Sequence, residues 1–101
     1  MLCRQAKRIH AMKTPAMKPR DRFAVNLRKA RQKKQISQEE LGFRCDLHRT
    51  EISLLERGGR EPRLATIMKL SAALDTTPDE LCRGIRWLTS QNRFQIKVQG
   101  G

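Results

Sequence analysis

The residues best suited to chemistry lie in a short stretch that carries both hydrogen-bonding and basic side chains. Arg49, Ser53 and Arg57 are spaced i, i+4 and i+8, so in a helix they share one outward face. Ile52 and Leu55 fall on the inward face of the same helix. A helix that is apolar behind and hydrogen-bonding in front is suited to the major groove of DNA. The base-reading residues predicted on this helix are Arg49, Thr50, Ser53 and Leu54.

Arg49 is the strongest of these candidates, because an Arg side chain can bond guanine O6 and N7 bidentately. Leu54 is a poor hydrogen-bonder, so contact with a thymine methyl and packing against the protein are equally good interpretations. Glu51 would accept from cytosine N4, although its place at the helix start favours a local role. Three further cations are candidates for phosphate contacts, or else simply face water. They are Arg57, Arg60 and Arg63.

The predicted helix needs a second one to position it. Ser37 with Glu40 three residues later forms a capping box, which satisfies free amide donors at a helix start. Leu41 and Cys45, four apart, then mark the apolar stripe of that helix. A turn is expected near Asp46, since Asp is one of the few non-glycine residues that accept a left-handed conformation. The stretch therefore predicts two short helices joined by a tight turn.

An ordered set of residues in this region resembles the helix-turn-helix domain of the phage repressor and Cro (XRE) family. The resemblance extends from Phe23 to Leu81 and implies an all-α, five-helix, lambda-repressor-like fold with motif helices at about 38–45 and 49–57. It also implies a transcriptional regulator of the helix-turn-helix class. The matching residues are Ser37 to Leu41, Ile52 and Ser53, Glu56 to Gly58, Arg60 and Pro62.

The resemblance assigns roles to three more residues. It implies that Gln38, at the start of the first motif helix, holds a phosphate together with the amides of that helix N-terminus. It implies a partly buried structural ion pair between Arg31 and Glu56, the alternative being two independent surface charges. The sequence departs from the usual family pattern at three positions: Gly42 stands in place of Ala, Asp46 in place of the turn Gly, and His48 in place of a Ser or Thr cap.

Three further helices complete the predicted domain, which spans residues 21–84. The first is expected from Asp21 to Lys34, with Asp21 as its cap. The fourth is expected from Leu64 to Leu74, and its cap position is Arg63, a residue poorly suited to capping. The fifth is short and begins at Thr77, where a cap is followed by Pro at the first helical position.

Both ends of the chain are more basic than its middle. Residues 1–20 carry six basic and no acidic side chains, and are predicted to form an unstructured arm. The arm either contacts the phosphates or the minor groove of DNA or precedes the true start of the protein, and an amphipathic targeting segment is a third alternative. In the tail, residues 85–101, polar and apolar residues alternate strictly from Arg93 to Val98, which predicts a strand. Its predicted partner strand is Ile85–Leu88, and the predicted turn covers residues 89–92. Such a hairpin would lie on the helical body or pair with a second subunit; an unstructured tail is the alternative.

Composition excludes several classes of protein. The net charge of +12 and the pI of about 10.9 favour a polyanionic partner. Three cysteines without a C-x-x-C pair argue against a disulfide framework, and Cys45 with His48 is at most half a zinc site. No apolar run is long enough to cross a membrane. No motif positions catalytic residues, and no cofactor, small-molecule or metal site is predicted, so an enzyme is not expected.

Together these observations predict a sequence-specific regulator that binds double-stranded DNA. A homodimer on a palindromic operator is expected, because helix-turn-helix proteins commonly read two half-sites. The predicted location is cytoplasmic and nucleoid-associated. Two alternatives stay open: an antitoxin-type interaction module that also binds DNA, and an RNA-binding protein, against which the few aromatic residues count.

Overall fold

The first described helix, α2, begins at a proline. The computed structural model describes residues 17–97, and α2 runs over Pro19–Lys34. Pro is suited to the first helical position, where its missing N–H has no partner to lose. The Asp21 carboxylate accepts a hydrogen bond from the Lys18 amide at 2.9 Å, from the third helical position. The prediction that α2 starts at Asp21 was therefore wrong, and the boundary expected between residues 20 and 21 falls inside α2. The predicted arm lies almost wholly outside the described residues.

The two motif helices occupy the predicted positions. α3 runs over Gln38–Cys45, and the Ser37 hydroxyl accepts from the Glu40 amide at 2.9 Å. α4 runs over Arg49–Glu56, one residue shorter than predicted. Between them Asp46 adopts a left-handed conformation with φ 59°, so the turn forms without a glycine. His48 takes the cap position of α4, where its Nδ1 atom accepts from the Thr50 amide at 2.9 Å.

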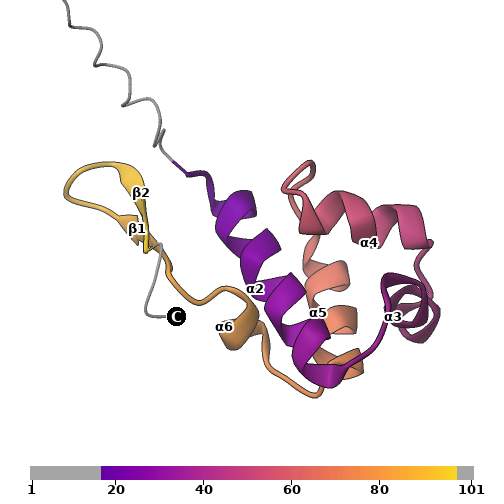
Figure 1. Ribbon diagram of the computed structural model, residues 1–101. Coiled ribbons are helices and arrows are strands. Elements are labelled where there is room, and N and C mark those ends of the chain that lie inside the picture. Colours follow the sequence, from indigo (N-terminus) through magenta and orange to yellow (C-terminus); the bar gives the residue numbers. More distant parts are fainter. Residues whose placement is uncertain (1–16, 98–101) are drawn as a thin grey trace, which may run out of the picture.

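Two more helices and a hairpin follow (Figure 1). α5 runs over Leu64–Ala73 without a side-chain cap, and α6 over Pro78–Leu81 with the Thr77 hydroxyl as its cap. The antiparallel strands β1 (Ile85–Leu88) and β2 (Arg93–Ile96) form the predicted hairpin. The described strand ends at Ile96, and Val98 lies outside the described residues. The five-helix, lambda-repressor-like prediction is confirmed, with this short sheet added.

The core is almost entirely aliphatic and joins all five helices. Phe23 is its one aromatic residue, as expected from a chain with four aromatic side chains. Cys45 is buried among these residues, and burial raises the pKa of its thiol, so the thiol stays neutral and packs as a small apolar group. None of the helices described here is long and apolar enough to cross a membrane. The cluster comprises Phe23, Leu27, Leu41, Cys45, Ile52, Leu55, Leu70, Leu74 and Leu81.

The hairpin lies against the helical body, one of the two arrangements expected. Ile85 packs on the core, and the Asn26 amide donates to the carbonyls of Leu81 and Arg83 at 2.8 and 2.9 Å. Buried Arg22 donates from Nε to the same Arg83 carbonyl at 3.1 Å. α2 therefore holds the chain where it leaves α6, and an otherwise marginal two-stranded hairpin gains a support.

A hydrogen-bonded ion pair between Arg31 and Glu56 connects α2 to the end of α4. Arg31 Nε lies 2.6 Å from Glu56 Oε2, and Nη2 lies 3.0 Å from Oε1, so the contact is bidentate. The side chains are 15% and 2% exposed. The hydrogen bond to Glu56 raises the pKa of Arg31, partly opposed by desolvation. Gln38 also donates to Glu56, at 3.1 Å, so one carboxylate serves three helices.

Replacing Arg31 by Met should destabilise the domain strongly. The change leaves the Glu56 carboxylate buried with a single side-chain donor, and loss of one partner from a buried pair costs about 3–5 kcal/mol. Urea unfolding followed by circular dichroism measures the loss. The matched control is Arg44→Gln, which breaks the exposed Arg44–Glu40 pair and should cost less than about 1 kcal/mol. Equal losses in the two variants would contradict a structural role for Arg31.

Candidate nucleic-acid interface

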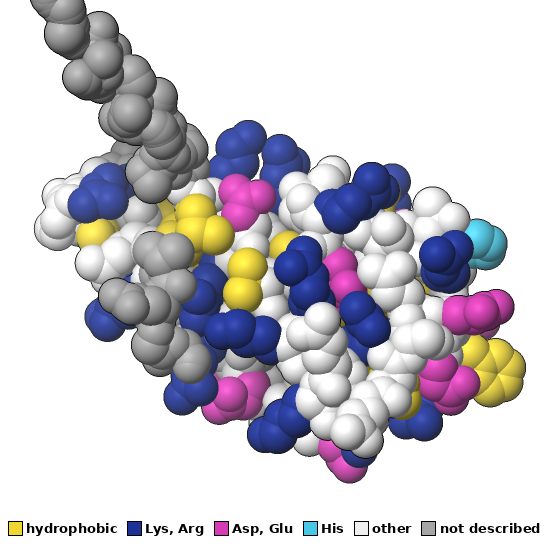
Figure 2. Space-filling model, viewed as in Figure 1, with side chains coloured by type: hydrophobic (Ala, Val, Ile, Leu, Met, Phe, Trp, Pro, Cys, Tyr) yellow, Lys and Arg dark blue, Asp and Glu magenta, His cyan; other side chains and the backbone are white. Residues whose placement is uncertain are grey.

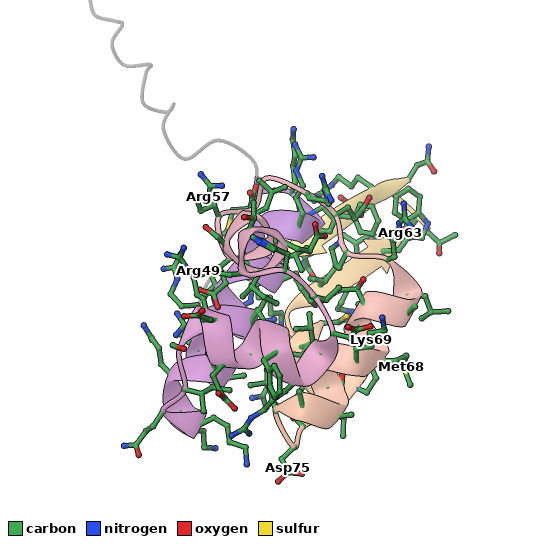
Figure 3. The ribbon with its side chains drawn as sticks, turned by 90° about the vertical axis from the view of Figure 1, so that its right-hand side faces the viewer. Arg49, Arg57, Arg63, Met68, Lys69 and Asp75 are labelled. Carbon is green, nitrogen blue, oxygen red and sulfur yellow. The ribbon has the colours of Figure 1, made fainter. Side chains whose placement is uncertain are left out.

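The outward face of α4 carries the residues predicted to read bases. Arg49 and Thr50 are exposed at the start of the helix, while Ser53 and Leu54 are half-buried further along it. In Figure 3, Arg49 and Arg57 project from the same side of the molecule, and Met68 projects from the other. The inward residues Ile52 and Leu55 are fully buried, so packing fixes which face α4 presents.

Leu54 packs against the turn that follows α4. A Cβ atom placed on Gly59 would lie 3.0 Å from Leu54 Cδ1, so the leucine side chain covers that glycine. Gly58 next to it has φ 71°, which a residue with a side chain adopts only under strain. This contact favours the packing interpretation of Leu54 over a thymine contact.

The residues expected to hold phosphates differ in their surroundings. Gln38 is half-buried at the first position of α3, and Nε2 uses one of its two hydrogens on Glu56. The second hydrogen is left for another acceptor. Arg57 and Arg63 are exposed, and neither meets a carboxylate within the described part of the chain.

Arg60 already has a partner, which sequence reasoning missed. Its Nη1 atom lies 2.7 Å from Oε1 of Glu51, nine positions earlier. Glu51, in the first turn of α4, thus contacts the loop that follows its own helix. The Arg60 side chain is 54% exposed, and such pairs contribute less than about 1 kcal/mol, so a phosphate can compete for the guanidinium. No local pattern marks this pair, because it depends on the path of the loop after α4.

Gly42 lets the turn of the motif pack closely. A Cβ atom at this position would lie 2.6 Å from the Leu47 carbonyl oxygen, which is closer than a real Cβ approaches any atom. The turn therefore passes too close to residue 42 for the Ala that is usual in the family, and Gly42 fits there. Asp46, the second departure, opens that turn in its left-handed conformation.

Within residues 17–97 no three His, Cys, Asp or Glu side chains are grouped as a metal ion would require. A cavity of about 410 Å³ lies between α2 and the α5–α6 connection. It is lined by charged side chains that include Lys29, Lys33 and Asp75. Asp75 lies at the opposite end of the molecule from Arg57, so this cavity is separate from the candidate interface (Figure 3).

Comparison with known proteins identifies the class of this chain. The helix-turn-helix family model HTH_3 matches residues 27–81, more than half of the sequence, and the chain belongs to that family. The match confirms the predicted family, whose members are DNA-binding regulators rather than enzymes.

Particular relatives are control proteins and repressors. The chain is similar to control protein C.BamHI of Bacillus amyloliquefaciens, with 48% identity over 60 residues, 58% of this chain and 74% of the relative. The restriction-modification controller protein C.AhdI from Aeromonas hydrophila matches with 42% identity and a TM-score of 0.60, over 61% of this chain and 94% of that one. The P22 c2 repressor, in complex with a synthetic operator, matches with 34% identity and a TM-score of 0.58, over 61% and 94%.

Replacing Gly42 by Ala should displace the turn between α3 and α4. The added methyl group meets a backbone carbonyl, which cannot rotate away as a side chain would, and overpacking of this kind costs about 1–3 kcal/mol. Thermal unfolding measures the loss. The difference between Gln32→Gly and Gln32→Ala, at an exposed position of α2, is the control for a change of helix propensity alone. A Gly42→Ala variant more stable than the parent would show that the turn accommodates the methyl group.

Proposed function

We propose that this protein is a sequence-specific regulator of transcription that inserts α4 into the major groove of double-stranded DNA. The observation that carries the proposal is the outward face of α4, where exposed Arg49 and Thr50 stand beside cations without carboxylate partners. The similarity to the P22 c2 repressor, crystallised with a synthetic operator, supports this mode of binding. The protein would act in the cytoplasm, at the nucleoid.

The proposed contacts divide into two kinds. Arg49, Thr50 and Ser53 read base edges, because they lie on the exposed face of a helix held by buried residues. Gln38, Arg57 and Arg63 hold phosphates, with Arg60 joining them when it leaves Glu51. Phosphate contacts fix the position of the helix in the groove but carry no sequence information.

We further propose that two copies associate through α5. Its exposed face is apolar except for Lys69, and Leu64 and Met68 are 76% and 52% exposed. An exposed apolar helix face of this kind marks a protein–protein contact. Met68 lies on the side turned away from Arg49, so association there leaves the reading face free (Figure 3). The exposed face comprises Leu64, Ala65, Met68, Lys69 and Ala72.

Selection of bound sequences from a pool of random duplexes tests the proposed function. A dimer should select a palindrome whose half-sites are about 10 base pairs apart, centre to centre, or a multiple of that spacing. A pool without any enriched sequence would contradict the proposal.

Arg49→Ala should reduce both affinity and selectivity. Loss of one bidentate base contact costs roughly 1–3 kcal/mol and relaxes the preference at one position of the half-site. Arg63→Gln should instead weaken binding to all sequences alike and lower the salt dependence by about one unit. Titrations of the selected duplex and of single-base variants over a salt series separate the two effects. Indistinguishable profiles would contradict the division into readers and phosphate contacts.

Met68→Glu should convert the protein to a monomer. A carboxylate placed in each copy of the apolar α5 face loses water on association and faces its own counterpart. Sedimentation equilibrium without DNA measures the change, and the variant should also bind the palindrome more weakly. Trp87→Ser is the matched control, since Trp87 on the hairpin is 51% exposed against 52% for Met68. If the hairpin substitution alone disrupts the dimer, the subunit contact lies there instead.

A further inference from the structure

The hairpin carries a concentration of positive charge that the helix-turn-helix contacts do not use. Residues 83–97 include four basic and no acidic side chains. Arg83 pairs with Glu80 at 3.5 Å, but Arg86, Arg93 and Lys97 meet no carboxylate in the part of the chain described. The Arg93 guanidinium donates only to neutral oxygens, those of the Gln91 side chain and the Phe94 carbonyl.

The register of the strands gathers two of these cations on one face. Residues paired across an antiparallel ladder share a face, and so do alternate residues along a strand. Arg86 pairs with Gln95 and Leu88 pairs with Arg93, so Arg86 and Arg93 are diagonal neighbours on the polar face. The other face holds Trp87 against Phe94, with ring centroids 4.9 Å apart.

The base of the hairpin lies beside α2. The Lys97 amide donates to the Gly84 carbonyl at 2.8 Å, which closes the base of the hairpin beside the buried Arg22. The bonds from Arg22 and Asn26 tie the carbonyls of Leu81 and Arg83, directly before the hairpin, to α2. A cationic surface that is already ordered loses less entropy when it binds a ligand.

The hairpin lies beside the candidate interface. Phe94, on the aromatic face opposite Arg86 and Arg93, lines one shallow cavity with Glu61 of the α4–α5 loop and with Lys18 and Arg20 at the start of α2. In the same region, a Cβ atom on Gly58 would lie 2.6 Å from the Asp21 side chain, so the loop packs on the first turn of α2. The hairpin, the start of α2 and the α4–α5 loop share the upper side of the molecule in Figure 1, and Lys and Arg side chains recur across the face drawn in Figure 2, with Asp and Glu side chains between them.

Charge decides what this surface binds. Pairing the hairpin with the same hairpin of a second copy would bring together like charges with no acidic residue to separate them, which is unfavourable. The α5 face offers a second copy a less charged contact. Duplex DNA is a regular polyanion, and the proposed function places it against the neighbouring α4–α5 loop. It is therefore a better match for the charge of the hairpin than a second copy of the hairpin. We propose that Arg86, Arg93 and Lys97 form a second contact with the phosphate backbone of duplex DNA, beyond the phosphates held by the α4–α5 loop.

The inference rests on the proposed function, because it assumes that DNA is bound at α4. The test is the triple variant Arg86→Gln, Arg93→Gln, Lys97→Gln, in which only exposed side chains change, with circular dichroism to check that the fold is kept. Each lost phosphate contact lowers the slope of log affinity against log salt by about 0.9, so a decrease of about 2–3 units is expected. The base preference should stay unchanged, and hydroxyl-radical protection at the outer edge of the site should disappear.

The matched control removes three cations from the opposite end of α2: Lys29→Gln, Lys33→Gln, Lys34→Gln. These residues line the cavity beside Asp75, and replacing them changes the net charge by the same amount as the triple hairpin variant does. The slope of log affinity against log salt for this control should stay close to that of the parent protein. An equal decrease in both variants would assign the effect to overall charge and overturn the inference.

The remaining outcomes separate the inference from the proposed function. An unchanged slope in the hairpin variant, with the parent still selective, overturns the hairpin contact and leaves the function of α4 intact. A hairpin variant that changes its sedimentation without changing the slope assigns the hairpin to a second subunit and also overturns the inference. A parent without base preference whose slope still falls in the hairpin variant overturns the proposed function and supports the hairpin contact.

Discussion

The arrangement of the helices depends on one buried carboxylate. Glu56 ends α4 with 2% of its side chain exposed, and it receives N–H donors from Arg31 of α2 and Gln38 of α3. A charge in such a place is tolerated only while its hydrogen bonds are complete. The relative positions of three helices are therefore constrained at one point, and the outward face of α4 is held at a fixed angle to the start of α3. A groove-binding helix needs this constraint, because its side chains must reach bases while neighbouring groups meet phosphates.

The surface separates into regions of different chemistry. Cations without carboxylate partners, among the residues described, extend over α4, the following loop and the hairpin. At the far end of α2, Lys34 pairs with Asp75 at 3.2 Å, while Lys29 and Lys33 meet no carboxylate among the residues described. The exposed side of α5 is apolar except for Lys69. A small protein with few aromatic residues can thus offer one surface to a polyanion and another to its own copy.

Most of the fold was predictable because the ends of its helices are determined by capping and turn residues close to them in the sequence. The hydroxyls of Ser37 and Thr77 cap α3 and α6, and Asp46 makes the left-handed turn, as the residue types alone indicate. The start of α2 was misplaced because Asp21 caps equally well from inside a helix that begins at Pro19. The pairing of Arg60 with Glu51 was not predictable, since it depends on how a glycine-containing loop folds back. The base-reading roles stay predictions, because they are defined by a partner and not by the fold.

The position of the single tryptophan has a practical consequence. Trp87 stands on the hairpin beside Phe94, outside the aliphatic cluster that joins the helices. Its emission therefore reports release of the hairpin from α2, whereas ellipticity reports loss of the helices. Coincident midpoints would mean that strands and helices melt as one cooperative unit, and separate midpoints would measure how loosely the two are coupled.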